Sequence, residues 1–421
     1  MQSESFDLIH RTIFGLLGQR LFGVPFTPAN GVDWEAVARE SKNQGVYYQV
    51  FSDFHHLPGI DGELKEKLWR LLARGMMKNM QVHAQHTDLH RLMTEHGIPY
   101  VTLKGAASAR YYPDPQSRAM GDVDFYIGEA DFDKALAVFR DAGFEAGAMD
   151  HICHVVLRKG RAHLEMHRMP AGVPEGNVGE IVKGYLESLR EDACLVQNPL
   201  VTCWCPSDFH HGLIMLMHLQ HHLVAEGIGL RHLCDWAVFV NQFRDEEFPK
   251  LFREKLRAVG LWKLARLLSL CAVECLGLPQ QNWMTEAASE PALARALMGD
   301  ILAGGNFGAK DPQRIYEGLF ISDRGKNGVK NSRISQGFQA LTRIAYMKYP
   351  LIKKCPVLLP FGWVAAFCGY LIRTRKRNRA GKDIHTHTAF KKSAARISIY
   401  RQLGLYEPEK NDRLRRKDRN L

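Results

Sequence analysis

The stretch IPYVTLKGAASARYYPDPQSRAMGDVDFYI covers residues 98–127 and decides how the rest of the chain is interpreted. It opens with an apolar run, 98–103, which predicts a buried strand. Lys104 and Gly105 end that run, and the small residues that follow have the composition of a helix start. After a proline-rich loop, the segment 122–127 (DVDFYI) predicts a second strand. The stretch therefore predicts a strand, a glycine turn, a short helix and a second strand in close succession.

The second strand carries two acids, Asp122 and Asp124. Because successive side chains of a strand alternate between its faces, both carboxylates project to the same side. Two carboxylates held close together are costly unless a cation lies between them. Oxygen ligands suit Mg²⁺ or Mn²⁺, which bind one or two carboxylates together with substrate phosphates. The backbone N–H groups of a glycine turn at a helix start can hold such phosphates. The alternative interpretation is a pair of solvated acids at a strand end.

The ordered set of strand, lysine-glycine turn, arginine loop and Asp-x-Asp strand resembles the nucleotidyltransferase fold of the polymerase-β-like superfamily. More narrowly, it is similar to a family of uncharacterised bacterial nucleotidyltransferases. The residues that carry the resemblance are Lys104-Gly105-Ala106, Arg118 and Asp122-Val123-Asp124. The general layout of that family fits the first two-thirds of the chain. Where the superfamily has a Gly-Gly or Gly-Ser pair, this chain has Gly105-Ala106.

The resemblance also implies a third carboxylate from a neighbouring strand. The segments 151–157 and 162–167, separated by RKGR, predict a β-hairpin. In its second strand His163, Glu165 and His167 share one face, and RAHLEMHR resembles the family's acid-x-His strand. Glu165 is therefore the candidate third acid. The alternative is that Glu165 and His167 line the solvent face of an edge hairpin, because alternation alone does not show which face is buried.

The resemblance implies metal-dependent transfer of a nucleotidyl group from a nucleoside triphosphate, such as ATP, to an unknown hydroxyl acceptor. The expected catalytic and metal-binding residues are Asp122, Asp124 and Glu165, with Mg²⁺ or Mn²⁺ lowering the pKa of the attacking hydroxyl. Lysine and arginine side chains would neutralise phosphate charge. The expected nucleotide-binding residues are Lys104, Gly105, Ala106, Ser108 and Arg118.

Three functions stay open on the sequence. Members of the resembled family are often associated with bacterial polysaccharide assembly, which gives the first function. Related toxin-like nucleotidyltransferases modify tRNA, which gives the second. The third is a catalytically silent, membrane-associated binding module that keeps the fold. Binding of the C-terminal segment to a membrane would favour the first, and salt-dependent binding of RNA would favour the second.

The chain is long enough for two or three domains, at 421 residues. The predicted fold class is α+β, with a nucleotidyltransferase-like mixed sheet flanked by helices. Helical patterns with capping and stop residues lie on both sides of the predicted core. The expected units are an N-terminal helical cap (1–97) packed on the sheet, a catalytic core (98–200), a C-terminal helical domain (201–350) and an apolar, basic segment (351–421).

The net charge of +11 is placed unevenly. Residues 351–421 contain 18 Lys and Arg against 5 Asp and Glu, which leaves 38 against 40 for the rest of the chain. A negatively charged partner, membrane or RNA, would therefore meet the tail rather than the body. The uncharged segment 355–372 is at the lower limit for spanning a bilayer and contains prolines and glycines. One interpretation is an interfacial segment over 353–379 on an anionic membrane, and the other is a buried apolar helix.

The N-terminus has no basic region followed by an apolar core, so no secretory signal is predicted. Nine cysteines are scattered without a paired framework, which indicates a reducing compartment and free thiols. The expected location is the cytoplasm, with peripheral association at the inner face of the membrane as an alternative.

A histidine-rich helix is predicted over 208–224. His218 and His222 are spaced i, i+4 and can bind a transition metal, but no third ligand is identifiable, so packing between helices is the main interpretation. The following Arg231 and Asp235 have the same spacing and are expected either to pair with each other or to orient substrate.

Overall fold

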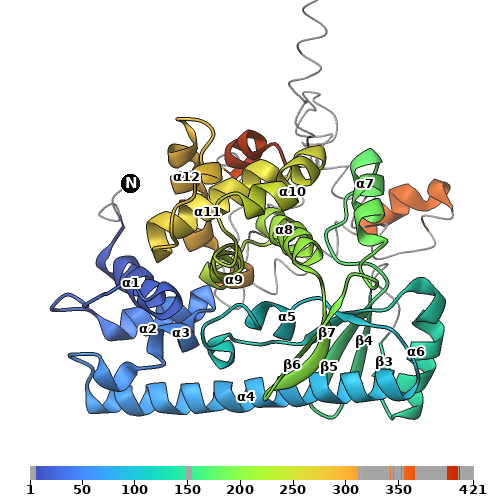
Figure 1. The fold of residues 1–421 in the computed structure, drawn as a ribbon, viewed down its shortest axis with the longest axis horizontal. Helices are drawn as coiled ribbons and strands as arrows, with labels where there is room; N and C mark the ends of the chain where they lie inside the picture. Colours follow the sequence, from blue (N-terminus) through green and yellow to red (C-terminus); the bar gives the residue numbers. More distant parts are fainter. Residues whose placement is uncertain are drawn as a thin grey trace, which may run out of the picture.

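The computed structural model describes residues 6–147, 154–311, 355–365 and 396–405, together with the single positions 314, 342, 345, 352 and 407. At its centre is a five-stranded sheet with the strand order β1-β2-β5-β4-β3. Strands β2 and β5 are parallel, and the other neighbouring pairs are antiparallel. Helices flank this mixed sheet (Figure 1), which confirms the predicted α+β class.

The strands are β1 (Val101–Thr102), β2 (Val123–Tyr126), β3 (Glu145–Ala146), β4 (His154–Lys159), β5 (Ala162–His167), β6 (Cys194–Asn198) and β7 (Val201–Cys205). The α-helices described here are α1 (Leu8–Phe22), α2 (Trp34–Gln44), α3 (Tyr47–Phe51), α4 (Gly62–Glu95), α5 (Ala106–Ala109), α6 (Glu129–Asp141), α7 (Asn177–Leu186), α8 (Asp208–Ala225), α9 (Leu230–Val240), α10 (Glu247–Ala258), α11 (Trp262–Leu276) and α12 (Glu290–Gly304).

The two faces of the central sheet differ because side chains alternate along each strand. On one face Val123 and Phe125 of β2, Leu164 and Met166 of β5 and Leu157 of β4 are buried. They form one hydrophobic core with side chains of α4 and α6. This apolar face fixes the register, since a slip by one residue would turn the whole set toward the opposite side. The opposite face carries the polar residues described below.

Helix α4 spans 34 residues, or about 51 Å at 1.5 Å per residue, and runs along the whole lower edge of the molecule in Figure 1. The side chain of Asp61 caps its first turn by accepting a hydrogen bond from the Leu64 amide. Leu89 and Met93 near its end belong to the core beneath the sheet. The helical spacing of apolar residues over 64–80 and its continuation over 81–96 predict helix, and both segments belong to this one continuous helix, which packs against the core of the sheet.

The other N-terminal helices are placed differently from the expectation of a cap on the sheet. Ile13 and Leu17 of α1 and Phe51 of α3 are buried in one hydrophobic core with the helices α8 to α12. Helix α1 packs on α11 in particular. The reason is composition: α1 is apolar on most of its circumference, so it is buried among other helices. Of the N-terminal helices, α4 is the one that packs against the core of the sheet.

A second, two-stranded sheet, β6–β7, had no counterpart in the sequence-based prediction. Its strand β7 packs beside β1, α4 and α5. Cys203 and Cys205 are buried there against Ala106 and Ala107. Both are free thiols, as are the other cysteines in the described residues. The hairpin therefore supports the turn that leads from β1 into α5.

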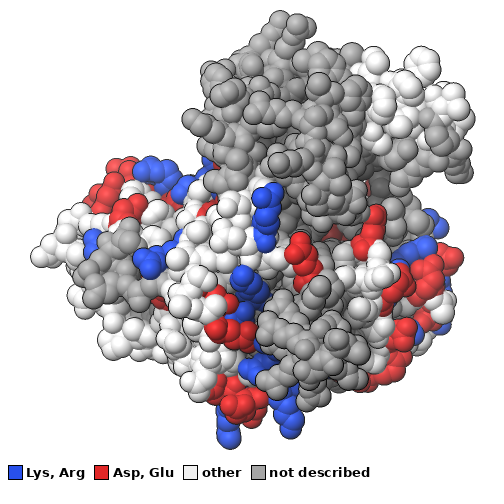
Figure 2. Space-filling model, turned by 90° about the horizontal axis from the view of Figure 1, so that it is seen from above, with Lys and Arg blue, Asp and Glu red and all other residues white. Residues whose placement is uncertain are grey.

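Part of the C-terminal prediction can be compared with the structure. Of the apolar segment 355–372, residues 355–365 are described. The polar stretch 323–332 (DRGKNGVKNS), for which the composition predicts a loop, and the strongly basic end lie outside the described residues. No helix within the described ranges combines the length and apolar character needed to cross a bilayer. Over the described surface in Figure 2, basic and acidic side chains are interspersed, in agreement with the nearly balanced charge of the body.

Candidate active site

The polar face of the sheet brings the predicted acids together. Strands β2 and β5 run parallel with Asp124 opposite Glu165, so these two side chains point to the same face. Asp122 precedes Asp124 by two residues, and its Oδ2 lies 3.9 Å from Nδ1 of His163 on β5. Asp124 and Glu165 therefore lie on two adjacent strands, and Asp122 directly precedes the first of them.

Strand β4 adds a histidine that the sequence analysis did not single out. His154 is paired with His167 across the antiparallel hairpin, with 4.9 Å between the ring centroids. The hairpin turns at Gly160, which has a φ of 57°, and at Arg161, and its first strand continues to Lys159, two residues beyond the start of the predicted four-residue loop. A two-residue turn at Gly160 would have paired His154 with His167 from the sequence alone. The expected strand positions 151–153 lie outside the described residues.

Asp124 is the buried centre of this face, with 3% of its surface exposed. Its Oδ1 accepts hydrogen bonds from Lys104 Nζ at 2.9 Å and from His167 Nε2 at 3.1 Å. Burial alone would favour the protonated acid, but these two partners hold the pKa of Asp124 well below its usual range. Burial would lower the pKa of His167, yet its contacts with Asp124 and Glu165 raise it. Asp124 is thus a carboxylate that is paired with the Lys104 ammonium and hydrogen-bonded to His167.

Asp122 and Glu165 are the more accessible acids, with 41% and 22% of their side chains exposed. Burial and then the negative charges of Asp124 and Glu165 raise the pKa of Asp122. The contact with His167 lowers the pKa of Glu165. Ligand atoms of Asp122, His163 and Glu165 lie within 4.8 Å of one another. Carboxylates this close repel each other unless a cation joins them, so the donor set fits Mg²⁺ or Mn²⁺.

The lysine-glycine turn lies against the same acids. Gly105 has a φ of 62°, a backbone conformation that favours glycine, and a Cβ there would lie 3.1 Å from His86 Nε2. The same Cβ would lie 3.8 Å from the backbone oxygen of Asp122. The amides of Ser108 and Ala109 donate to the Gly105 carbonyl, and the amides of Gly105 and Ala106 precede these bonds. The turn therefore places the start of α5 near the edge of the acidic cluster.

Two of the predicted nucleotide-binding residues have other partners. The Ser108 hydroxyl lies 3.4 Å from His211 Nε2 in a buried contact with α8. Arg118 is buried, and its guanidinium donates to both carboxylate oxygens of Asp235 at 2.7 and 2.8 Å. The Tyr112 hydroxyl donates to the same carboxylate at 2.7 Å. Arg118 therefore binds Asp235 of α9, whereas the predicted Lys104 contacts the acidic cluster, through Asp124.

The ion pair of Arg118 with Asp235 bears on the expectation that Asp235 pairs with Arg231. Its hydrogen-bond partners are Arg118 and Tyr112, and Arg231 acts on it only through charge. Burial would raise the pKa of Asp235, but the charge and hydrogen bonds of Arg118 lower it to about 2. This bidentate ion pair ties the loop before β2 to α9 over a long sequence distance.

Histidine side chains of the helix α8 pack against one another and against neighbouring rings. The rings of His218 and His222 lie 4.2 Å apart, and His222 contacts both His232 and Phe307. The His222 imidazole is hydrogen-bonded to Glu226 at 3.1 Å. Within the described ranges, two groups of side chains have the spacing to hold a metal ion, and neither includes these histidines.

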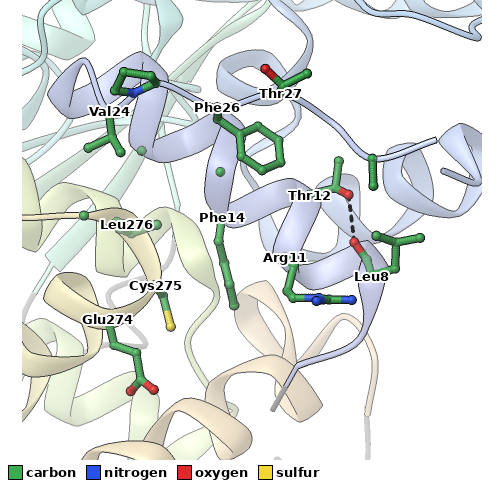
Figure 3. Close-up of a pocket in the computed structure, with 15 residues that line it drawn as sticks. Leu8, Arg11, Thr12, Phe14, Val24, Phe26, Thr27, Glu274, Cys275 and Leu276 are labelled. Atoms are coloured by element: carbon green, nitrogen blue, oxygen red, sulfur yellow. Dashed lines mark hydrogen bonds between the residues drawn. The ribbon is translucent and has the colours of Figure 1, made fainter. Parts of the chain in front are cut away.

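A pocket of about 440 Å³ lies apart from the acidic cluster. It is formed by α1, the segment 24–29 and the end of α11 (Figure 3). Phe14 and Phe26 line it, and none of the predicted site residues does. This pocket is therefore not part of the candidate active site.

A mixed sheet with clustered carboxylates beside a lysine-glycine turn defines the nucleotidyltransferase-like class expected from the sequence. The sequence model of a family described as "uncharacterised nucleotidyltransferase" matches residues 30–277, which is more than half of the chain. The chain belongs to this family of uncharacterised nucleotidyltransferases. The matched region contains the whole polar face, from Lys104 to His167, together with Asp235 of α9. No curated protein matches the chain.

Proposed function

We propose that the protein transfers an NMP group from a nucleoside triphosphate to a hydroxyl acceptor in a reaction that depends on Mg²⁺ or Mn²⁺. The observation that carries this proposal is the convergence of Asp122, Asp124 and Glu165 beside Lys104, in a chain that belongs to a nucleotidyltransferase family. The three acids would hold the ion. When bound, the ion neutralises the triphosphate and lowers the pKa of the acceptor hydroxyl.

Lys104 has two roles in this proposal. In the structure its ammonium neutralises the buried Asp124. With nucleotide present, the flexible lysine side chain turns toward the triphosphate, as a compact charge on a four-carbon stem can. The amides of Gly105 and Ala106 then hold phosphate oxygens, and most of the rate acceleration comes from positioning and electrostatics. Arg118 acts as a positioning residue, because its fork is bound to Asp235.

The acceptor that we propose is a hydroxyl of a membrane-linked molecule of polysaccharide assembly. The family resemblance supports this choice, and a surface feature favours a membrane location. Val357, Phe361 and Val364 have 81%, 73% and 64% of their surface exposed. These apolar side chains follow Lys353 and Lys354, and exposed apolar groups beside lysines suit an anionic membrane surface. Peripheral association with the inner face of the membrane follows from this proposal.

The test incubates the full-length protein with NTPs labelled at the α-phosphate and with separate lipid, sugar, protein and RNA fractions of a bacterial extract. Label in the lipid or sugar fraction supports the proposal. Label in RNA would instead support the toxin-like alternative, and flotation with anionic liposomes, with and without residues 351–421, tests the membrane contact independently. Absence of Mg²⁺–NTP binding by calorimetry would point to the silent binding module.

A further inference from the structure

A second group of potential metal ligands lies on the same sheet, one strand further from the glycine turn. It consists of His154 on β4 and of Glu165 and His167 on β5, whose ligand atoms all lie within 4.8 Å of one another. We propose that this triad of two histidines and one glutamate binds a transition-metal ion of the Zn²⁺ class. Glu165 would then be a potential ligand both of this ion and of the ion proposed for Asp122, an expectation that rests on the proposed function.

The backbone holds these three side chains ready for an ion. His154 and His167 are direct partners across an antiparallel pair, and Glu165 lies two residues from His167 on the same face. All three side chains come from regular strands whose opposite face is packed in the core. A site built on packed strands is held more accurately than one on loops, so little ordering cost would accompany ion binding.

The distances between the three side chains are close to those of a metal site, so ion binding would require only a small movement. Glu165 Oε2 lies 3.9 Å from His154 Nε2 and 3.6 Å from His167 Nε2. Ligands at about 2.0 Å from a tetrahedral Zn²⁺ are roughly 3.3 Å apart. Each nitrogen therefore has to approach the carboxylate by only about half an ångström, within the range of side-chain adjustment.

The triad and the neighbouring acids differ in the metal ions that their donor atoms prefer. Two imidazoles and one carboxylate suit Zn²⁺, Co²⁺ and similar ions, whereas clustered carboxylates suit Mg²⁺. Glu165 is common to both groups of potential ligands, the other being Asp122, His163 and Glu165. A carboxylate shared by two sites can bridge two ions, as two-metal phosphoryl-transfer enzymes require.

A structural alternative is that His167 only holds two acids together. In the structure its Nε2 contacts Asp124 at 3.1 Å as well as Glu165. An imidazolium in that place would neutralise both acids without any ion. The two interpretations differ for His154: an ion needs it as a ligand, whereas the bridge between His167 and the acids does not.

The test uses full-length protein freed of metal and titrated with Zn²⁺ alone by calorimetry, followed by Co²⁺ absorption spectroscopy. His154→Ala should weaken Zn²⁺ binding by at least about 10–100-fold, since loss of even an outer-shell partner of a metal causes that much. The same variant should lose the ligand-field spectrum of bound Co²⁺. His154 is 19% exposed, and His154→Gln is a second variant that keeps the polar volume if the alanine variant does not fold.

Two controls make the outcome specific. His56→Ala removes an exposed histidine on another element and should leave Zn²⁺ binding unchanged. Asp122→Asn should abolish nucleotide transfer but retain Zn²⁺ on the triad. Equal Zn²⁺ affinity in wild-type protein and His154→Ala, or loss of Zn²⁺ from Asp122→Asn to the same extent, would overturn the proposal. Because neither NTP nor acceptor is present, failure of the proposed function would not affect this result.

Discussion

Lys104 and Asp124 form a hydrogen-bonded ion pair, with 2.9 Å between Nζ and Oδ1, that joins the turn after β1 to the middle of β2. The pair places a cation on the most buried acid of the cluster. A divalent ion that binds Asp124 must compete with this ammonium. Nucleotide, which attracts the ammonium, would therefore favour ion binding to Asp124.

This competition predicts the behaviour of Lys104→Met. Without metal, the variant should lose about 2 kcal/mol of unfolding free energy, less than the 3–5 kcal/mol of a fully buried pair because the Lys104 side chain is 26% exposed. Mg²⁺ should then raise its melting temperature more than that of the wild type, since the Lys104 ammonium no longer competes for Asp124. Thermal unfolding with and without Mg²⁺ measures both effects, with the exposed Lys78→Met as control. An equal or smaller Mg²⁺ effect in Lys104→Met would contradict the competition.

The glycine turn gives a second prediction. Gly105→Ala should cost about 1–2 kcal/mol, because an alanine at φ 62° is strained and its Cβ would crowd His86. Gly121→Ala is the matched control, since a Cβ at Gly121 would meet nothing within 4 Å. Chemical denaturation of both variants gives the comparison. Equal stability of the two would show that the turn does not require glycine.

The buried pair of Arg118 and Asp235 predicts a large stability effect. Arg118→Met leaves a buried carboxylate without its main partner and should cost about 3–5 kcal/mol. Adding Asp235→Asn should restore part of that loss, because the uncompensated charge is then removed as well. A double-mutant cycle by urea denaturation measures the coupling. Purely additive effects would mean that the pair does not contribute as a unit.

Asp235 also makes stability depend on pH. Its pKa is lowered to about 2 in the folded protein, against an ordinary value of 3.8. The ionised Asp235 therefore contributes about 2 kcal/mol to the free energy of unfolding. This contribution is fully present above the ordinary pKa and is lost as pH falls through the pKa of the folded protein. The stability difference between wild type and Asp235→Asn should therefore narrow by about 1 kcal/mol between pH 5 and pH 3. Urea denaturation of both proteins at both pH values measures this difference. A stability difference that does not change with pH would show that Asp235 does not couple folding to protonation.

Local patterns were sufficient for much of the fold. Period-two alternation predicted that Asp122 and Asp124 share a face, and the parallel register with β5 places Glu165 there as well. The helix predicted over 208–224 corresponds to α8, which follows the capping residue Ser207, whose side chain accepts a hydrogen bond from the His210 amide. The alternation and the cap depend on neighbours in sequence and can be recognised without knowing the tertiary structure, whereas Glu165 was expected from the family resemblance.

Contacts between distant residues could not be predicted in the same way. Arg118 pairs with Asp235, 117 positions away, because the fold brings α9 to the loop before β2. The i, i+4 spacing of Arg231 and Asp235 suggests a pair between them and gives no sign that Arg118 binds Asp235 instead. His154 was overlooked because its role depends on the hairpin register, which a turn shorter by two residues sets. The β6–β7 hairpin lacks the Gly-containing turn that announces such pairs.

The most direct test of the central claim is transfer of label from NTP to acceptor, compared for the α- and γ-phosphates. The proposed reaction predicts that α-label appears on the acceptor, that γ-label does not, and that transfer requires Mg²⁺ or Mn²⁺. Asp122→Asn should abolish transfer, while the exposed control Asp133→Asn should retain it. Transfer of γ-label, or undiminished α-label transfer by Asp122→Asn, would contradict the assignment of a nucleotidyl-transfer site to these acids.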